Sequence, residues 1–280
     1  MKILIVGATG ALGRHVTPRL IERGHHVRAI VRSKTHDASL REMGAEPVMG
    51  DIFDKVSLQE AAQGCEVAIH IATAIPKSGS VDWSLNDRVR REGTRNLLEI
   101  AGDQGMKRYI QQSVTLLYGD HGQTIVDESA PFKPSEIVQS ASDMEELVRA
   151  SALDWCILRG GLFYGADTGR EDGWRKSAQQ GRLTIPGDGS DLLSLIHVVD
   201  MARAVVAAAE EAPPKSLYNI VDDHPVSYRE VFNYVCAQLN VSPPQPGGAK
   251  FLPSLGCSNV KVRRELEWAP LYPSYRSGLA

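Results

Sequence analysis

Three glycines near the start of the chain carry its clearest chemical signal. Gly7, Gly10 and Gly13 follow one another at a spacing of three, directly after an apolar run. Residues without a Cβ allow a tight turn, a close approach of the backbone to a pyrophosphate, and close packing of the next helix on the strand. The N–H groups and the dipole of that helix then face an anion. The pattern predicts a phosphate-binding turn between a strand at residues 1–6 and a helix at residues 12–23, as in dinucleotide-binding proteins.

The end of the predicted second strand, at residues 27–31, bears on which dinucleotide would bind. The residue at that end is Arg32, and no acidic residue stands there. An acid there would accept hydrogen bonds from both ribose hydroxyls of NAD, whereas an arginine suits the 2′-phosphate of NADP. We therefore expect NADP in preference to NAD. The alternative interpretation is a solvated arginine at a strand end.

Strand and helix patterns alternate after the glycine turn, which predicts a parallel α/β sheet. The Pro/Gly-rich stretch at residues 242–248 is the one clear connector. The further strands are predicted at residues 47–51, 67–71, 107–111, 154–158 and 217–221, and the further helices at residues 55–63, 82–102, 135–150, 201–211 and 227–239.

The composition is that of an ordinary soluble globular protein. The chain has 280 residues, of which 42% are hydrophobic and 23% charged, and these fit one large domain or two small ones. The net charge of −3 gives no case for binding nucleic acid or an anionic membrane. No apolar run approaches the ~18 residues of a membrane span. The four cysteines have no metal-site spacing, so we expect free thiols, no metal and a cytoplasmic protein.

The segment GATGALG at residues 7–13 resembles the cofactor loop of the extended short-chain dehydrogenase/reductase superfamily, which includes NAD-dependent epimerases and dehydratases. The resemblance continues in the same order at residues 92–101, 159–165, 186–200 and 261–270. It implies a Rossmann-type doubly wound parallel sheet with a smaller C-terminal substrate lobe. The implied NAD(P)-binding domain is residues 1–160, to which residues 191–224 return, and the implied substrate lobe is residues 161–190 and 225–280.

The resemblance also implies which residues would hold the cofactor. The glycine loop would bind the pyrophosphate, an aspartate after the third strand would hydrogen-bond the adenine amino group, and the segment after the fourth strand would lay its backbone along the cofactor. The residues concerned are Gly7, Thr9, Gly10, Ala11, Leu12, Gly13, Arg32, Asp51, Ile52, Ile71, Ala72 and Thr73.

Enzymes of this family mostly use a tyrosine and a lysine four residues later, and the lysine charge lowers the pKa of the tyrosine for proton transfer. No tyrosine of this chain is followed four residues later by a lysine. The family pattern over residues 140–155 places Ile137 at the tyrosine position and Ala141 at the lysine position. Val114 falls at the serine position, and Arg90 stands where the family often has an asparagine. One acid–base group typically contributes ~10²–10⁴-fold to a rate, so the usual chemistry should be lost.

Five other side chains are candidates for a substitute acid or base, although no spacing assigns any of them a role. Two of them are tyrosines in turn motifs, where tyrosines are commonly structural. The histidine stands at the start of a helix, and the alternative to a catalytic role for it is support of a loop. These candidates are Thr115, Tyr118, Tyr164, Asp143 and His197.

Two functions remain open from the sequence. The first is an epimerase-, dehydratase- or reductase-like enzyme with a divergent site, acting on a small hydroxyl or carbonyl metabolite such as a sugar nucleotide. A substrate that needs no proton relay, or brings its own acid, could still react. The alternative is a non-catalytic dinucleotide sensor or regulatory module. The retained substrate-side segments favour the enzyme. The family also implies a homodimer through the helices at residues 82–102 and 135–150.

Overall fold

The computed structural model describes residues 1–76 and 82–279 of the chain. Its internal contacts divide the chain into two compact units. The first consists of Met1–Ser113, Glu136–Leu158 and Ala202–Leu217, and the second of Val114–Ser135, Arg159–Met201 and Tyr218–Ala280.

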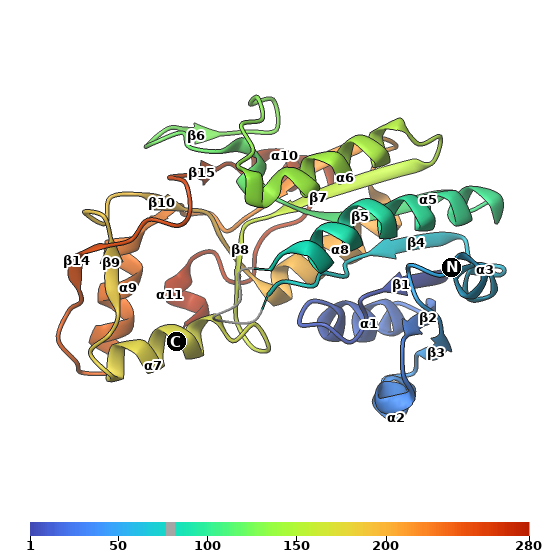
Figure 1. The fold of residues 1–280 in the computed structure, drawn as a ribbon, viewed down its shortest axis with the longest axis horizontal. Coiled ribbons are helices and arrows are strands. Elements are labelled where there is room, and N and C mark those ends of the chain that lie inside the picture. Colours follow the sequence, from blue (N-terminus) through green and yellow to red (C-terminus); the bar gives the residue numbers. More distant parts are fainter. Residues whose placement is uncertain (77–81, 280) are drawn as a thin grey trace. The chain divides into compact units, whose positions relative to one another are not determined.

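A seven-stranded sheet organises the first unit (Figure 1). Its order is β12-β7-β5-β4-β1-β2-β3, and β1 pairs in parallel with both β2 and β4. The chain leaves β1 toward one side for β2 and β3, and toward the other for β4 and β5. This doubly wound order is the predicted one, and in such folds the reversal is the switch point at which ligands bind. The strands are β1 (Lys2–Val6), β2 (His26–Val31), β3 (Glu46–Met49), β4 (Val67–His70), β5 (Arg108–Val114), β7 (Asp154–Gly160) and β12 (Ser216–Ile220).

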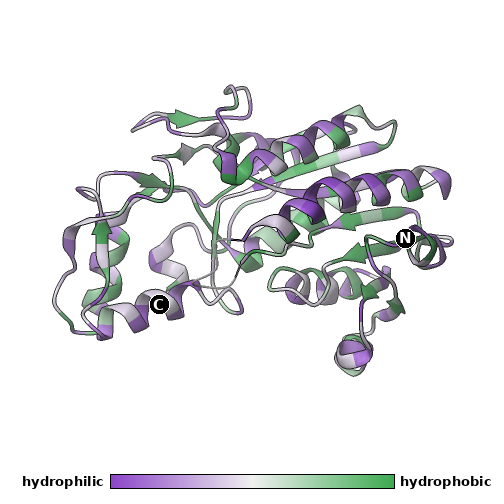
Figure 2. Cartoon of the chain, in the orientation of Figure 1, coloured by the Kyte–Doolittle hydropathy of each residue, from purple (hydrophilic) through white to green (hydrophobic). Residues whose placement is uncertain are grey.

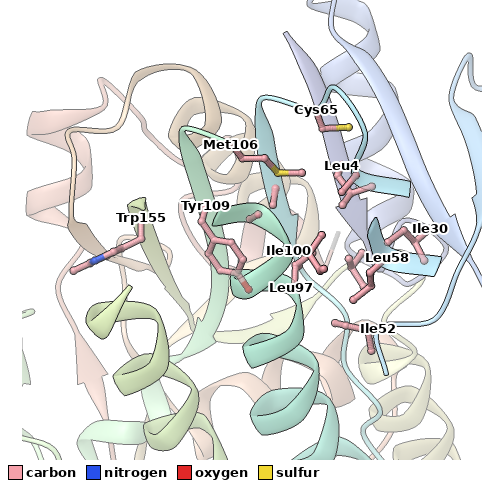
Figure 3. Close-up of a cluster of buried hydrophobic side chains, with 14 of the residues drawn as sticks. Leu4, Ile30, Ile52, Leu58, Cys65, Leu97, Ile100, Met106, Tyr109 and Trp155 are labelled. Carbon is pink, nitrogen blue, oxygen red and sulfur yellow. The ribbon is translucent and has the colours of Figure 1, made fainter. Parts of the chain in front are cut away.

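The apolar run that begins the chain forms the centre of this sheet. Ile3, Leu4 and Ile5 of β1 have no exposed surface, because strands lie on both sides and helices cover the faces. Figure 3 shows Leu4 in one buried cluster with Leu58 and other apolar side chains from strands and helices. The helices of this unit are α1 (Gly13–Glu22), α2 (Asp37–Glu42), α3 (Lys55–Ala62), α4 (Ser84–Arg88), α5 (Thr94–Asp103), α6 (Gln139–Ala150) and α8 (Val198–Glu211), with the 3₁₀ turns η1 (Lys34–His36) and η4 (Glu136–Val138).

The predicted helix at residues 82–102 is not one regular helix. A π-helical turn, η2 (Val89–Gly93), separates α4 from α5. Gly93 ends this turn against Ile52, because a Cβ at Gly93 would lie 2.9 Å from the Cδ1 atom of Ile52. Single π turns are rare and occur often at functional sites.

The predicted helix at residues 135–150 also begins later than expected. Glu136–Val138 forms the 3₁₀ turn η4, and α6 starts at Gln139. Ile137 therefore lies before the helix and is 51% exposed, whereas Ala141 lies within α6 and is fully buried. The two positions that the family pattern aligned do not share one regular helical face.

Four two-stranded pairs and four helices make up the described part of the second unit. Its main core packs α7 against α9, where the Trp174 and Phe232 rings lie edge to face with centroids 5.5 Å apart. The elements are β6 (Ile125–Val126), β8 (Leu162–Tyr164), β9 (Thr184–Pro186), β10 (Leu192–Leu193), β11 (Leu195–His197), β13 (Val226–Ser227), β14 (Gln245–Gly248), β15 (Gly256–Cys257), the 3₁₀ turn η3 (Thr115–Tyr118), α7 (Arg170–Gln179), α9 (Tyr228–Gln238), α10 (Val260–Glu265) and α11 (Tyr275–Gly278).

Two features of the second unit differ from expectation. The connector at residues 242–248 contains a strand, since β14 pairs in parallel with β9. Gly248 fits there because a Cβ would lie 2.7 Å from the Thr184 hydroxyl oxygen. The expected division also kept residues 114–135 with the cofactor-binding part. Here that segment groups with the second unit, because β6 pairs with β15 and Tyr118 donates a hydrogen bond to Asn219.

Polarity follows the layers within each unit. Figure 2 shows hydrophobic central strands and helices that alternate between hydrophobic and hydrophilic faces. Across the two described ranges, no helix is both long and apolar enough to cross a bilayer. All four cysteines are buried and free, as expected. The described residues also contain no cluster of side chains that could hold a metal ion.

Candidate functional site

The glycine loop connects β1 to α1 in the first unit. Gly7 has φ of +104°, a left-handed conformation that glycine adopts at little cost. A Cβ at Gly7 would lie 2.7 Å from the backbone nitrogen of Ala72, and one at Gly13 would lie 2.1 Å from the carbonyl oxygen of Gly7. Close backbone packing therefore requires glycine at both positions.

Gly10 has a different environment from the other two. Its N–H donates to the Gly7 carbonyl at 3.1 Å, and a Cβ at Gly10 would meet only that oxygen, at 3.4 Å. A side chain here would be sterically acceptable within the chain itself. The missing Cβ leaves a cradle above the loop that the protein does not fill.

The start of α1, which follows the loop, carries no side-chain cap and no negative charge of its own. Leu12 is the N-cap residue, so no side chain caps the helix, and its first turn contains no acid. Thr9 and Ala11 lie in the same loop, where the Thr9 carbonyl accepts a hydrogen bond from Arg14 at 3.2 Å. A helix N-terminus of this kind stabilises an anion. The cradle and the helix start together fit the pyrophosphate of a dinucleotide.

The segment after β4 lies against the glycine loop. Ile71 donates its N–H to the Val6 carbonyl at 3.0 Å and is buried. Ala72 is half-buried, and Thr73 is exposed. The structure thus brings the predicted segment Ile71, Ala72 and Thr73 next to the loop at the carboxyl ends of β1 and β4.

The two predicted adenosine-side residues follow β2 and β3. Arg32 is exposed at the end of β2. Asp51 is half-buried, and its Oδ1 accepts a hydrogen bond from the Phe53 N–H at 2.9 Å. The carbonyl of the buried Ile52 accepts a hydrogen bond from Asn96 at 3.0 Å. Both predicted side chains therefore lie at the same sheet edge as the loop, on the β2–β3 side.

No side chain at the aligned tyrosine and lysine positions can exchange a proton, since both are hydrocarbon. Beside Val114, at the aligned serine position, the buried Ser113 donates its hydroxyl to the fully buried Glu145 at 2.7 Å. Asp143 accepts hydrogen bonds from Gln139 at 3.0 Å and from Arg91 at 2.6 Å. Burial raises the pKa of Asp143, but these two partners outweigh it and hold that pKa below its ordinary value. Asp143 is therefore an ionised salt-bridge residue and a poor acid.

Two of the other candidates lie close together in the second unit. Thr115 is buried in η3. Tyr118 has no exposed surface and donates its hydroxyl to Asn219 at 2.8 Å. Burial raises the pKa of Tyr118 to about 12. A phenol fixed in this way supports the fold and does not exchange protons near neutral pH.

Tyr164 and His197 also belong to the packing of the second unit. Tyr164 is fully buried and donates to the Ser274 carbonyl at 3.2 Å, and burial raises its pKa. The His197 ring lies against the Tyr272 ring with centroids 3.8 Å apart. Neither side chain is presented as an acid or base, so the structural interpretation of both is the stronger one.

An open pocket of about 330 Å³ lies wholly within the second unit. Arg170 anchors one wall by donating its Nε–H to the Phe163 carbonyl at 2.7 Å, and its guanidinium lies over the Trp174 ring. Aromatic walls with a cation suit a flat, negatively charged group. The pocket is lined by Leu162, Arg170, Trp174, Ser177, Arg182, Leu183, Thr184, Pro186, Tyr228, Phe232, Ala249, Phe251 and Leu252.

Sequence reasoning assigned no role to one buried residue at the carboxyl edge of the sheet. Asn86 of α4 accepts a hydrogen bond from the Ala74 N–H at 3.0 Å and thereby holds the chain just beyond Thr73. Arg90 lies four residues later, at the position where the chain departs from the family pattern. The spacing of these two polar residues along one predicted helix was the available signal.

Comparison with known proteins agrees with this geometry. The model of the "NAD dependent epimerase/dehydratase family" matches residues 3–220. The chain is 30% identical to the 3-diazoavenalumate denitrifying reductase of a Streptomyces species, over 100% of this chain and 99% of that protein. It is 28% identical to the 2-alkyl-3-oxoalkanoate reductase of Stenotrophomonas maltophilia, over 85% of this chain and 76% of that protein.

Solved structures share the fold. DesIV, a dTDP-glucose 4,6-dehydratase from Streptomyces venezuelae solved with NAD, has a TM-score of 0.86 at 23% identity and is matched over 100% of this chain and 95% of its own. The UDP-glucose 4-epimerase of Thermotoga maritima has a TM-score of 0.83 at 21% identity, over 100% and 96% of the two chains. The chain therefore belongs to the NAD dependent epimerase/dehydratase family, within the extended branch of the short-chain dehydrogenase/reductase superfamily.

Proposed function

We propose that this protein is an NAD(P)H-dependent reductase whose substrate accepts a hydride without receiving a proton from a side chain. One observation carries the proposal. The cradle at Gly10 and the start of α1 are intact, while the aligned tyrosine and lysine positions hold Ile137 and Ala141. Such a protein would bind and orient a hydride donor but could not protonate an alkoxide.

The glycine loop, Arg32, Asp51, Ile52 and the segment Ile71, Ala72 and Thr73 would hold the dinucleotide. When bound, the cofactor supplies a hydride. The residues of the chain would fix the pyrophosphate at α1 and the adenosine half on the β2–β3 side. The second unit, with its aromatic pocket, would hold the substrate, which is the role expected of the substrate lobe.

An aryl diazonium ion is a substrate class that meets this requirement. Its reduction forms a C–H bond at the ring carbon and breaks the C–N bond, whose electron pair leaves with N₂, so aryl–N₂⁺ and H⁻ give aryl–H and N₂ with no proton taken up. The full-length relative supports this class, because its name describes the denitrifying reduction of a diazo compound. Reduction of a ketone, in contrast, needs a proton for the new hydroxyl, and loss of the side chain that supplies this proton typically costs ~10²–10⁴-fold in rate.

A substrate comparison tests the proposal. The purified protein with NADPH should consume cofactor and release N₂ from 4-carboxybenzenediazonium, and NADPH deuterated at its transferred position should place deuterium on the ring carbon that carried nitrogen. A panel of ketones should react far more slowly. A reaction without protein measures the background. Tight NADPH binding without turnover of either class would instead support the regulatory module, and faster ketone reduction would contradict the proposal.

Replacing Arg32 tests the choice of cofactor. Arg32→Ala should weaken NADPH binding by about tenfold to a hundredfold, because one charge-assisted hydrogen bond to the 2′-phosphate is lost. NADH binding should not change. Titration calorimetry with both cofactors measures the difference, and Lys34→Ala, which removes a nearby exposed cation, is the control. An equal loss for both cofactors would contradict the preference for NADP.

A further inference from the structure

The guanidinium of Arg90 is a buried cation that has no salt-bridge partner among the described residues. Its side chain belongs to the π turn η2, and the residue is 7% exposed. In the described ranges, its hydrogen-bond partner is the Ser140 hydroxyl at 3.2 Å, and no carboxylate lies within ion-pair distance. Burial lowers the pKa of Arg90, and the charge of Asp87, beyond salt-bridge distance, offsets this only in part. A charge in this position is costly unless another acceptor compensates it.

Asn86, one helical turn before Arg90, has a side-chain N–H donor without a hydrogen-bond partner in the described chain. It is fully buried, and its Oδ1 accepts the Ala74 N–H. Its Nδ2 is buried and has no acceptor among the residues that the structure describes. Residues four apart lie on the same side of a helix. Asn86 and Arg90 together therefore offer several N–H donors on one side, and the chain itself supplies few acceptors to them.

Both residues border segments of the candidate cofactor site. Asn86 holds the chain after Ile71, Ala72 and Thr73, and Arg90 contacts α6 beside Ala141, at the aligned lysine position. The π turn brings this segment close to Ile52 through Gly93. An unpaired Asn86 donor beside a buried cation that bonds only to a neutral hydroxyl, at the carboxyl edge of the sheet, suits an oxygen-rich ligand.

The strand order indicates which half of a dinucleotide would lie there. Arg32 and Asp51 follow β2 and β3, on one side of β1, and would take the adenosine half. Ala74 follows β4, and α6 follows β5, on the opposite side of β1. With the pyrophosphate at α1, the nicotinamide half must extend over β4 and β5.

We infer that Arg90, supported by Asn86, is a binding residue for the nicotinamide half of the cofactor, where its cation takes the place left by the missing lysine. Its guanidinium donates to the oxygen acceptors of that half, and Asn86 sets the neighbouring backbone and donates beside it. The inference rests on the proposed cofactor site. It gives a reason for a buried cation that folding alone would not retain.

Two affinities, one for the whole cofactor and one for its adenosine half, distinguish this inference from the proposed function. Arg90→Met should weaken NADPH by about tenfold to a hundredfold, as expected for loss of charge-assisted hydrogen bonds. The affinity for adenosine 2′,5′-bisphosphate, which lacks the nicotinamide half, should not change. Arg90→Lys should recover part of the NADPH affinity. Arg91→Met, at the adjacent arginine that pairs with Asp143, is the matched control and should change neither affinity.

Stability without ligand provides the second measurement. Removing a buried charge that has no salt-bridge partner should leave the melting temperature of Arg90→Met unchanged or higher. A lower melting temperature, with parallel loss of both ligands, would show a structural role and overturn the inference. An unchanged NADPH affinity of Arg90→Met would also overturn the inference, even if the apparent affinity for substrate fell. Failure of the wild-type protein to bind either ligand would instead refute the cofactor site.

Discussion

Gly10→Val should abolish measurable binding of NADPH while the protein stays folded. A Cβ added at Gly10 would meet only the Gly7 carbonyl oxygen, at 3.4 Å, so we expect the folded chain to accept the substitution. The larger side chain would fill the cradle in which the pyrophosphate should lie. We expect a loss of at least about a hundredfold in affinity, which is ~2.7 kcal/mol. Fluorescence or calorimetric titration measures the affinity, and thermal unfolding checks the fold.

Gly13→Ala is the contrasting variant within the same loop. Its Cβ would lie 2.1 Å from the Gly7 oxygen and 2.5 Å from Ala8 backbone atoms. Backbone cannot move aside as a flexible side chain can, so we expect destabilisation of about 1–3 kcal/mol or more, together with lost binding. If Gly10→Val unfolded as readily as Gly13→Ala, the cradle would be a packing feature. If Gly10→Val bound NADPH normally, the cofactor site would be wrong.

Stability of the protein should fall as pH rises through about 8 because of Asp222. Asp222 is buried in the second unit, its Oδ1 accepts the His224 N–H at 3.2 Å, and its Oδ2 is buried without a partner in the described chain. Burial, reinforced by the charges of Asp223 and Asp200 and partly offset by the bond from His224, raises its pKa from 3.8 to about 8.

The sign of this effect follows from linkage. The folded state holds the proton more tightly than the unfolded state does. The stabilising contribution is therefore complete below about pH 4 and is lost progressively up to about pH 8. Asp222→Asn removes the titration and should stabilise the protein by a few kcal/mol, as an order of magnitude, at about pH 9, with little gain at about pH 4.

Urea unfolding across this pH range measures the prediction. Asp127→Asn is a control of opposite sign, since hydrogen bonds from the Ser129 hydroxyl and backbone lower the pKa of Asp127. Its contribution to stability is present at high pH and is lost on acidification. A pH profile of Asp222→Asn that parallels the wild type would show that the Asp222 carboxyl is not held protonated.

The local sequence was enough to predict the fold of the first unit. The branched run of β1, the glycine turn and the alternation of strands and helices each act over a few residues, and the structure confirms the parallel order around β1. The loss of a proton-transferring pair was also a sequence property, because no arrangement of the chain gives Ile137 or Ala141 an exchangeable proton. The residues that would hold the cofactor remain predictions of the same kind.

Tertiary contacts decided features that no local pattern contained. The π turn η2 depends on packing of Gly93 against Ile52, and the strand β14 forms because β9 accepts it. The roles of Tyr118 and Tyr164 were open in the sequence, since a phenol serves catalysis or packing according to its burial and its partner. The charge balance of Arg90 and Asp222 was equally hidden. A sequence shows which groups carry charge, but only the fold determines which counter-ions and hydrogen-bond partners remain within a few ångströms of them.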